Sequence, residues 1–422
     1  MWSAVRAMRV VVHEAAASTG KSSSKATTGA GGTIAAGAAA LAPMFVGAAL
    51  AGLLTAPYAQ AQIVANPMAP NGMRPTILVA PNGIPAINIA TPSAAGVSRN
   101  QYLQFDVNGR GVVVNNSRTA VQSQIGGFIQ SNPYLATGPA RVIVNEVYSS
   151  NPSYINGPVE IAGSRADFIL ANPVGISVNG ATFLNSGAVT LTTGTPQFNA
   201  FGGLDSYVVR GGTVSINGVG LDLSRTDYAA ILARAVQVNA AIHANDLKVV
   251  AGANTISADH ANVTPTAGTG STPTFALDVS QLGGMFANHI FLVGTEAGLG
   301  SRNAGSIGAS NGNLVVTSAG RLENTGTLEG TRVELASAGD IDNRGGTIRQ
   351  TSSAGLAITA PVLSNTNGGI IGAEPLPAPT AGSGGGASTG GSAGTGGTAS
   401  PGTPTAGTGS TSGTSGTASP AP

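Results

Sequence analysis

Short apolar runs separated by turn residues dominate the chain from residue 62 onward. Residues 112–114, 142–144 and 189–191 are rich in Val, Ile or Thr, and Asn or Gly follows each run within three residues. β-Branched residues favour strands, whereas Asn and Gly favour turns. Turn signals recur at intervals of roughly 8–12 residues, a spacing typical of β-sandwiches, barrels and solenoids.

Two segments show a more regular pattern. Val236, Val238, Ala240, Ile242 and Ala244 alternate with more polar residues, which predicts a strand with one apolar face. Residues 224–235 instead resemble a helix start, because SRTD has the form of a capping box. The apolar residues that follow this box have helical spacing, so one short helix is expected here.

The chain repeats itself between residues 301 and 373. Asn324, Asn343 and Asn365 each lie in an apolar–x–Asn pattern followed by Gly, and they are spaced 19 and then 22 residues apart. A period of about 20 residues is typical of stacked solenoid coils, which bury their apolar faces only against one another. Asn tolerates turn conformations, and its amide can bond the same residue in the next coil. The pattern therefore favours a right-handed parallel β-helix over a sandwich.

The two ends of the chain differ from this body. Residues 1–61 combine scattered basic residues with an apolar run from 34 to 54, and they end in an Ala-Gln-Ala signal. They are predicted to be an extended signal peptide rather than a membrane helix. The residues that define the cleavage site are Ala59, Ala61 and Gln62. At the other end, residues 374–422 are almost entirely Gly, Ala, Ser, Thr and Pro, which predicts a disordered linker or tail.

Composition excludes several kinds of chemistry. The chain has no Cys, so disulfides and cysteine-ligated metals are impossible. Residues 1–61 hold four of the 19 basic residues and one of the 18 acidic ones, which leaves 15 basic against 17 acidic residues in the remainder. A nearly neutral body lacks the basic surface expected of a nucleic-acid-binding protein. No second apolar stretch is long enough to span a membrane, so no integral span is expected after cleavage.

The most informative stretch runs from residue 167 to 194 and contains the motif NPVGI. It closely resembles the N-terminal secretion domain of filamentous haemagglutinin and related two-partner-secretion exoproteins, which include contact-dependent growth-inhibition proteins. NPVGI matches the family's Asn-Pro-Asn-Gly-Ile motif at four of five positions, and NPYL at 132–135 matches Asn-Pro-Asn-Leu at three of four. Residues 62–300 are expected to form the secretion domain, and 301–373 resemble the family's haemagglutinin coils.

The resemblance implies a fold, a partner and a set of site residues. The expected fold is all-β: a right-handed parallel β-helix with an N-terminal cap and short extra-helical elements. The expected partner is an outer-membrane transporter, a β-barrel with periplasmic modules, and a host or bacterial cell surface would be the later target. Export would pass through the periplasm of a Gram-negative bacterium. The transporter-recognition residues would be Asn132, Pro133, Tyr134 and Leu135, together with Asn172, Pro173, Val174, Gly175 and Ile176.

Asn-Pro-x-Gly is also a turn signal in its own right. Pro173 fixes φ at about −65°, and Gly175 supplies positive φ without a steric penalty. A turn between two strands is therefore expected whatever the function. Whether the transporter would contact the side chains at Tyr134 and Val174, or only the turn backbone, remains open at this stage.

The sequence gives only weak signals for catalytic or metal-binding sites. Ser310 lies in a nucleophile-elbow pattern, GASNG, but no His follows it in the sequence. Gly20-Lys21-Ser22 lacks the upstream Gly of a phosphate-binding loop. His243, His260 and His289 have no metal-ligand spacing, and Asp340 with Asp342 is expected to be a solvated pair that could at most contact calcium. No cofactor, metal or enzymatic activity is expected.

Two functions from different classes follow. The first is an exported two-partner-secretion exoprotein that serves as an adhesin or as the delivery stalk of a growth-inhibition toxin. The alternative is an extracellular polysaccharide-degrading β-helix enzyme. Such enzymes line a groove with clustered acids, Lys and Arg. Beyond the signal segment, Lys248 is the only lysine of this chain, and its acidic residues are scattered along the sequence.

Overall fold

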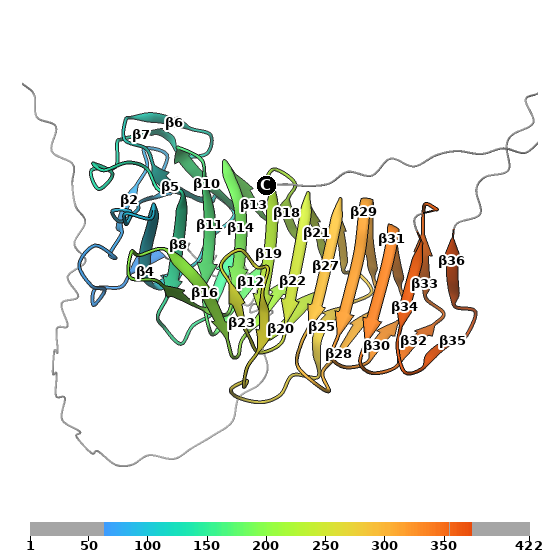
Figure 1. Ribbon diagram of the computed structural model, residues 1–422. Coiled ribbons are helices and arrows are strands. Elements are labelled where there is room, and N and C mark those ends of the chain that lie inside the picture. Colours follow the sequence, from blue (N-terminus) through green and yellow to red (C-terminus); the bar gives the residue numbers. More distant parts are fainter. Residues whose placement is uncertain (1–62, 354, 374–422) are drawn as a thin grey trace, which may run out of the picture. The chain divides into compact units, whose positions relative to one another are not determined.

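Parallel strands stacked in three ladders form the body of the protein. The computed structural model describes residues 63–353 and 355–373, and all regular structure within these ranges is β. The predicted signal peptide, its cleavage site and the predicted disordered tail lie outside the described residues. Successive coils add strands to these ladders in turn, and the chain winds as a right-handed parallel β-helix, as predicted (Figure 1).

Three sets of strands make up these ladders. The first ladder comprises β3 (Pro85–Asn88), β5 (Val112–Asn116), β10 (Pro158–Gly163), β13 (Ala181–Leu184), β18 (Leu221–Leu223), β21 (Ala241–Ala244), β26 (Gly284–Ala287), the first parts of β29 (Ser306–Ser318) and β31 (Thr327–Ser337), β33 (Thr347–Gln350) and β36 (Ile370–Ala373). The second comprises β4 (Val97–Phe105), β8 (Val142–Val147), β11 (Ala166–Ala171), β14 (Ser186–Thr192), β19 (Tyr228–Ala233), β22 (Asp246–Ala251), β27 (His289–Gly294), the later parts of β29 and β31, and β34 (Leu356–Thr359). The third comprises β9 (Ser153–Ile155), β12 (Gly175–Val178), β17 (Thr213–Ile216), β20 (Ala235–Val238), β25 (Phe275–Val279), β28 (Gly300–Asn303), β30 (Leu322–Asn324), β32 (Ile341–Arg344) and β35 (Leu363–Thr366).

Antiparallel strands cap the N-terminal end. β1 (Ile63–Ala65) pairs antiparallel with β4, and β2 (Thr76–Val79) forms a hairpin with β3. These pairings cover the edge of the first coil, which would otherwise present unpaired backbone groups. The predicted N-terminal cap is therefore confirmed.

The main core fills the interior of the helix. Inward side chains are mostly Ile, Val, Leu and Ala, and one continuous cluster runs from Ile63 to Ile348. Strand β31 shows the alternation clearly, with inward residues buried and outward residues more exposed. The stacked strands continue through residue 300 without a break, since β25 pairs with β28 and β28 with β30. A domain boundary near residue 300 stays a prediction.

The repeated asparagines form a hydrogen-bonded ladder inside the last coils. Asn303 Nδ2 donates to Asn324 Oδ1 at 2.8 Å, Asn324 donates to Asn343 at 2.7 Å, and Asn343 donates to Asn365 at 2.7 Å. The predicted bond between equivalent residues in successive coils is confirmed. However, these asparagines lie at the ends of strands and do not have positive φ, so their conformational tolerance is not what places them.

A small sheet packs outside the helix. β15 (Thr195–Phe198), β16 (Leu204–Val209), β23 (Asn254–Ser257) and β24 (Val263–Pro265) pair antiparallel in that order. The sheet lies over the second ladder (Figure 1). It covers outward apolar residues of that ladder, and a second core lies between them. The members of this core include Val144, Ile169, Leu232, Tyr207 and Ile256. A separate hairpin of β6 (Val121–Ser123) and β7 (Gly127–Ile129) covers part of the first ladder. These are the predicted extra-helical elements.

The helix predicted over residues 224–235 is wrong. Residues 224–226 form a turn, and β19 and the start of β20 follow. In β19 both faces are buried, because Ile231 points into the main core and Leu232 into the second core. A continuous apolar run of this kind cannot be distinguished from a helix by periodicity alone. Asp227 does not cap a helix but forms an ion pair with Arg165 at 2.8 Å.

The alternating segment 236–244 also differs from expectation. It forms two strands, β20 and β21, separated by a corner at residues 239–240. Val236, Val238 and Ile242 all lie in the main core. The corner preserves the alternation of inward and outward residues, so the sequence pattern does not reveal the break.

The asparagine ladder should make a measurable contribution to stability. Replacing Asn343 with Ala removes bonds to Asn324, Asn365 and the Gly346 carbonyl. Buried unsatisfied partners remain, so we expect the free energy of unfolding to fall by about 1–3 kcal/mol in urea titrations. The control is Asn311→Ala, which removes a single exposed bond to Asn288. Equal effects of the two substitutions would contradict a structural role for the ladder.

His260 should make stability depend on pH. It lies in the turn between β23 and β24, where it is buried against the rings of Tyr207 and Tyr228, with centroid distances of 5.6 and 5.7 Å. Burial and nearby Lys248 lower the pKa of His260 from 6.5 to about 4. The unfolded chain therefore takes up a proton before the folded chain does as the pH falls.

Stability is thus fully present above pH 6.5 and is lost as the pH falls toward 4. The loss should be on the order of 2–3 kcal/mol. His260→Asn, which tolerates the positive φ of 59° at this position, should reduce this dependence in denaturation curves measured at several pH values. His243→Asn, a change at an exposed site, serves as the control; if both variants keep the wild-type slope, His260 is not the source.

Candidate functional site

The turn that contains Asn172 links β11 to β12. The Asn172 side chain is fully buried, and its Nδ2 donates to the Asn151 carbonyl and to Ser153 Oγ, both at 3.0 Å. Its Oδ1 accepts the amide of Val174 at 3.0 Å, and its carbonyl accepts the amide of Gly175 at 3.1 Å. The side chain therefore joins the turn to the neighbouring coil and fixes the turn's shape at the same time.

The turn at Asn132 repeats this arrangement. Asn132 is 3% exposed, and its Nδ2 donates to the carbonyls of Ile89 and Asn115 at 3.0 Å. Its Oδ1 accepts the amide of Tyr134 at 3.0 Å. The two motifs thus use the same bonds although they lie at different places on the helix. In both motifs the Asn side chain is buried and anchors the turn.

The residues at the tips of the two turns are exposed. Pro133 and Pro173 are exposed, Tyr134 is 40% exposed and Val174 is 42% exposed. The remaining members of the two motifs, Leu135, Gly175 and Ile176, are buried. Gly175 has φ of 147°, and a Cβ there would lie 2.9 Å from the Thr213 carbonyl oxygen, so this position needs glycine. Any partner of the folded turn would meet proline and the residue after it.

The two turns do not belong to one corner of the helix. The Asn132 turn lies on the path from β5 in the first ladder to β8 in the second. The Asn172 turn lies between β11 in the second ladder and β12 in the third. Each corner therefore presents its own motif.

Two hollows flank Pro173. One, of about 300 Å³, is lined by Glu146, Tyr148, Pro173, Thr195 and Pro196, among others. The other, of about 510 Å³, is lined by Pro173, Thr193, Gln197, Arg210 and Thr269, among others. Pro173 and Thr195 border both hollows. The exposed proline therefore stands between two concave surfaces, one on each side.

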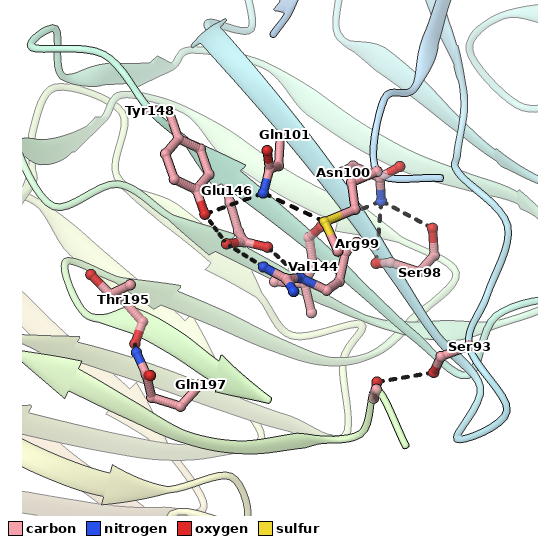
Figure 2. A network of polar contacts seen from close by, with 12 residues as sticks. Ser93, Ser98, Arg99, Asn100, Gln101, Val144, Glu146, Tyr148, Thr195 and Gln197 are labelled. Carbon is pink, nitrogen blue, oxygen red and sulfur yellow. Dashed lines mark hydrogen bonds and ion pairs between the residues drawn. The ribbon is translucent and has the colours of Figure 1, made fainter. Parts of the chain in front are cut away.

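A polar network supports the wall of the smaller hollow. Figure 2 shows how Arg99, Gln101 and Tyr148 surround Glu146. Arg99 binds the Glu146 carboxylate at 2.9 and 3.3 Å, and the Tyr148 hydroxyl donates to it at 2.8 Å. Burial, followed by the charge of Glu146, raises the pKa of Tyr148 to about 12, so this phenol stays protonated and remains a donor.

This network also fastens the outer sheet. The Arg99 guanidinium lies 3.7 Å from the ring centroid of Phe198 on β15, close to Thr195 and Gln197. Sequence reasoning did not identify Arg99, Glu146 or Tyr148, because nothing in the local pattern around each residue predicts the contact. The available signal was Glu146, a charged residue near the end of the largely apolar strand β8.

The other candidate residues do not assemble into a reactive site. Ser310 lies in the middle of β29 and its hydroxyl donates to the Ala287 carbonyl at 3.2 Å. His289 binds Asp246 at 2.9 Å, and Asp342 binds Arg344 at 2.9 Å. Within the described ranges there is no group of three or more His, Asp or Glu side chains that could hold a metal ion.

Comparison with known proteins identifies the family of this chain. The family model for the TPS secretion domain, the secretion domain of two-partner secretion, matches residues 61–324. The chain belongs to the two-partner-secretion family. Both Asn-Pro turns, both hollows and most of the β-helix lie inside the matched region. The resemblance seen in the motifs is therefore confirmed.

Relatives and a solved structure agree with this membership. The chain is 44% identical over 342 residues to "Toxin CdiA" of Yersinia pestis, which is 81% of this chain. It is 46% identical over 275 residues, 65% of this chain, to "tRNA nuclease CdiA-2" of Burkholderia pseudomallei. The crystal structure of the filamentous hemagglutinin secretion domain is 32% identical with a TM-score of 0.60, and the match covers 74% of this chain and 99% of that one.

The matched region is a small part of those relatives. It spans 10% of the Yersinia pestis protein and 9% of the Burkholderia pseudomallei protein. Among residues 63–353 and 355–373, no helix is long and apolar enough to cross a membrane.

The burial of Asn172 changes the effect expected of its replacement. A surface Asn would lose about one bond, but Asn172→Ala removes three and leaves buried partners behind. We expect the free energy of unfolding to fall by about 2–4 kcal/mol in urea titrations. Val174→Ala, at the exposed tip of the same turn, should change it by no more than about 0.5 kcal/mol. A small effect of Asn172→Ala would contradict the anchoring role.

Proposed function

We propose that this chain is an exported exoprotein whose folded β-helix is recognised by a partner outer-membrane transporter. The partner would be a β-barrel with periplasmic modules. The chain would pass through the periplasm of a Gram-negative bacterium to the cell surface or the extracellular space. Family membership supports this route.

The observation that carries the proposal is the shared geometry of the two turns. Each has a buried Asn that bonds the preceding coil and an exposed Pro followed by an exposed apolar residue. Pro173 adds hollows on both sides, into which side chains of a partner could pack. A rigid apolar tip between concave surfaces is a suitable anchor point for a protein partner. We infer that Tyr134 and Val174 are contacted directly, whereas Asn132 and Asn172 hold the turns in shape.

The exported protein would serve contact with another cell. One of the two relatives named above is a toxin and the other is a tRNA nuclease. Since the matched region spans about a tenth of their length, we propose that this chain supplies the secretion and stalk portion of a toxin-delivery protein, or of an adhesin. Its described residues would then have no catalytic role of their own. The polysaccharide-degrading alternative receives no support from the relatives above.

The fold also suggests how export could proceed without ATP in the periplasm. Each new coil is stabilised by the backbone ladder and by the Asn contacts of the coil before it. In a stack of this kind stability comes from nearest-neighbour contacts, so coils can form one after another. Coils beyond the recognised turns that form outside the cell would prevent the chain from sliding back.

Recognition is tested by changing the exposed tip without touching the anchor. Val174→Glu places a charge beside Pro173, and we expect binding to the transporter's periplasmic modules and the amount of exported protein both to fall at least about tenfold. The thermal midpoint should stay unchanged, because residue 174 is exposed. The matched control is Val219→Glu, since Val219 is 85% exposed at another corner. Full binding and export of Val174→Glu would overturn the proposal.

A further inference from the structure

A column of outward side chains on the first ladder is interrupted by a glycine. Across neighbouring strands the paired residues are Asp222, His243, Phe286, Gly308, Glu329 and Arg349. Their neighbours along each strand, such as Met285 and Ile307, lie in the main core, so the column faces outward. Gly308 is the one position in this run without a side chain.

The missing side chain leaves one face of an aromatic ring uncovered. Phe286 is 40% exposed, and His243 stacks on it with ring centroids 5.4 Å apart and planes at 21°. The next residue on the opposite side of Phe286 is Gly308. A Cβ at Gly308 would approach only Phe286 Cδ1, at 3.8 Å, so the space above this glycine is open.

Polar groups surround this space. The hollow has a volume of about 680 Å³, within the usual range of small-molecule sites, and lies over β21, β26, β29 and β31. The wall opposite Phe286 is Glu329, whose carboxylate binds Arg349 Nη2 at 2.5 Å. The other polar lining groups are hydroxyls and an amide, from Ser224, Ser306, Ser310, Thr327, Thr351 and Asn288, and Ala244, Ala287, Ile307 and Ala309 add apolar surface between them.

The dimensions suit a single ring. Neighbouring strands of a sheet lie about 4.8 Å apart, so Phe286 and Glu329 are separated by about 9.5 Å along the column. One ring placed above Gly308 would continue the stack that His243 and Phe286 begin. It would also present its other side to the Glu329 carboxylate.

We propose that this hollow binds a neutral sugar ring of a glycan. The apolar C–H face of a hexose packs on the open face of Phe286, and its hydroxyl groups bond to Glu329 and to the surrounding Ser, Thr and Asn side chains. The ligand is neutral because Glu329 and Arg349 already neutralise each other. A flat aromatic ligand would use the stacking face but would leave the polar lining without partners, which carries a penalty. The site binds sugar without cleaving it.

Binding is measured on the purified full chain with a panel of neutral disaccharides: lactose, maltose, cellobiose and mannobiose. The anionic trisaccharide sialyllactose serves as the comparison. Saturation-transfer NMR and calorimetry should detect at least one neutral sugar with a Kd of about 1 mM or tighter. Absence of binding by every neutral sugar, or binding of the anionic sugar alone, would overturn the proposal.

Two variants locate the site. Phe286→Ala should weaken binding at least about tenfold, whereas Phe291→Ala should leave it unchanged, since Phe291 is 37% exposed on the second ladder outside the hollow. Gly308→Val fills the space above the glycine with a residue that suits a strand, and it should abolish binding. The thermal midpoint of each variant shows whether the fold is kept.

Equal affinities of Phe286→Ala and Phe291→Ala, or full binding by folded Gly308→Val, would contradict this location. Export is a separate readout. Phe286 lies away from both Asn-Pro turns in the sequence, and its replacement should leave transporter binding and export at the wild-type level. Loss of sugar binding with normal export therefore separates this site from the recognition turns.

Discussion

Each coil of this protein can bury its apolar residues only against another coil. The inward side chains form one cluster along the stack, and the backbone bonds that hold it run between coils rather than within them. Polar side chains obey the same constraint, because buried asparagines at strand ends and in turns must find partners in a neighbouring coil. Asn324, Asn343 and Asn172 all do so. Vertical pairing between coils thus decides which residues can be anchors and which remain exposed.

The exposed features follow from this division. Where Asn172 is committed to the coil before it, the two residues that follow are forced outward as a fixed tip. Where the second ladder carries apolar residues on its outer side, the antiparallel sheet covers them, and Arg99, Glu146 and Phe198 fasten its edge. The hollows beside Pro173 are the spaces left between this sheet and the coils. The proposed recognition surface is therefore a consequence of how the outer sheet meets the helix.

Much of the fold could be predicted from the sequence because its repeat is explicit. The spacing of Asn324, Asn343 and Asn365 predicts the stacked coils, although it does not reveal Asn303 as the first member of the ladder. The failure at residues 224–235 has a physical cause: β19 is buried on both faces, so its apolar run carries no strand alternation. The corner at residues 239–240 is not predicted for the opposite reason, since the chain turns there while the alternation of apolar and polar residues continues.

The candidate site could be predicted only in part. The turn residues are visible in the sequence because Asn, Pro and Gly each favour a particular backbone conformation. Their burial is not visible, because it depends on Asn151, Ser153 and Ile89, which belong to other coils. Glu146 and Tyr148 are likewise brought to Pro173 by the stacking of the second ladder and the outer sheet. Contacts between coils depend on which residues of neighbouring strands lie side by side. The sequence around a single polar residue does not show which residue of the next coil it will face.

The central claim is that the transporter recognises the folded β-helix at the tips of its Asn-Pro turns. Hydrogen–deuterium exchange of the full chain, with and without the transporter's periplasmic modules, tests this most directly. The account predicts added protection at residues 172–175 and in the strands that line the hollows beside Pro173, with the main core protected in both conditions. Added protection only on other surfaces would contradict it. Binding of the modules only to chains whose core amides exchange freely, and which are therefore unfolded, would also contradict it.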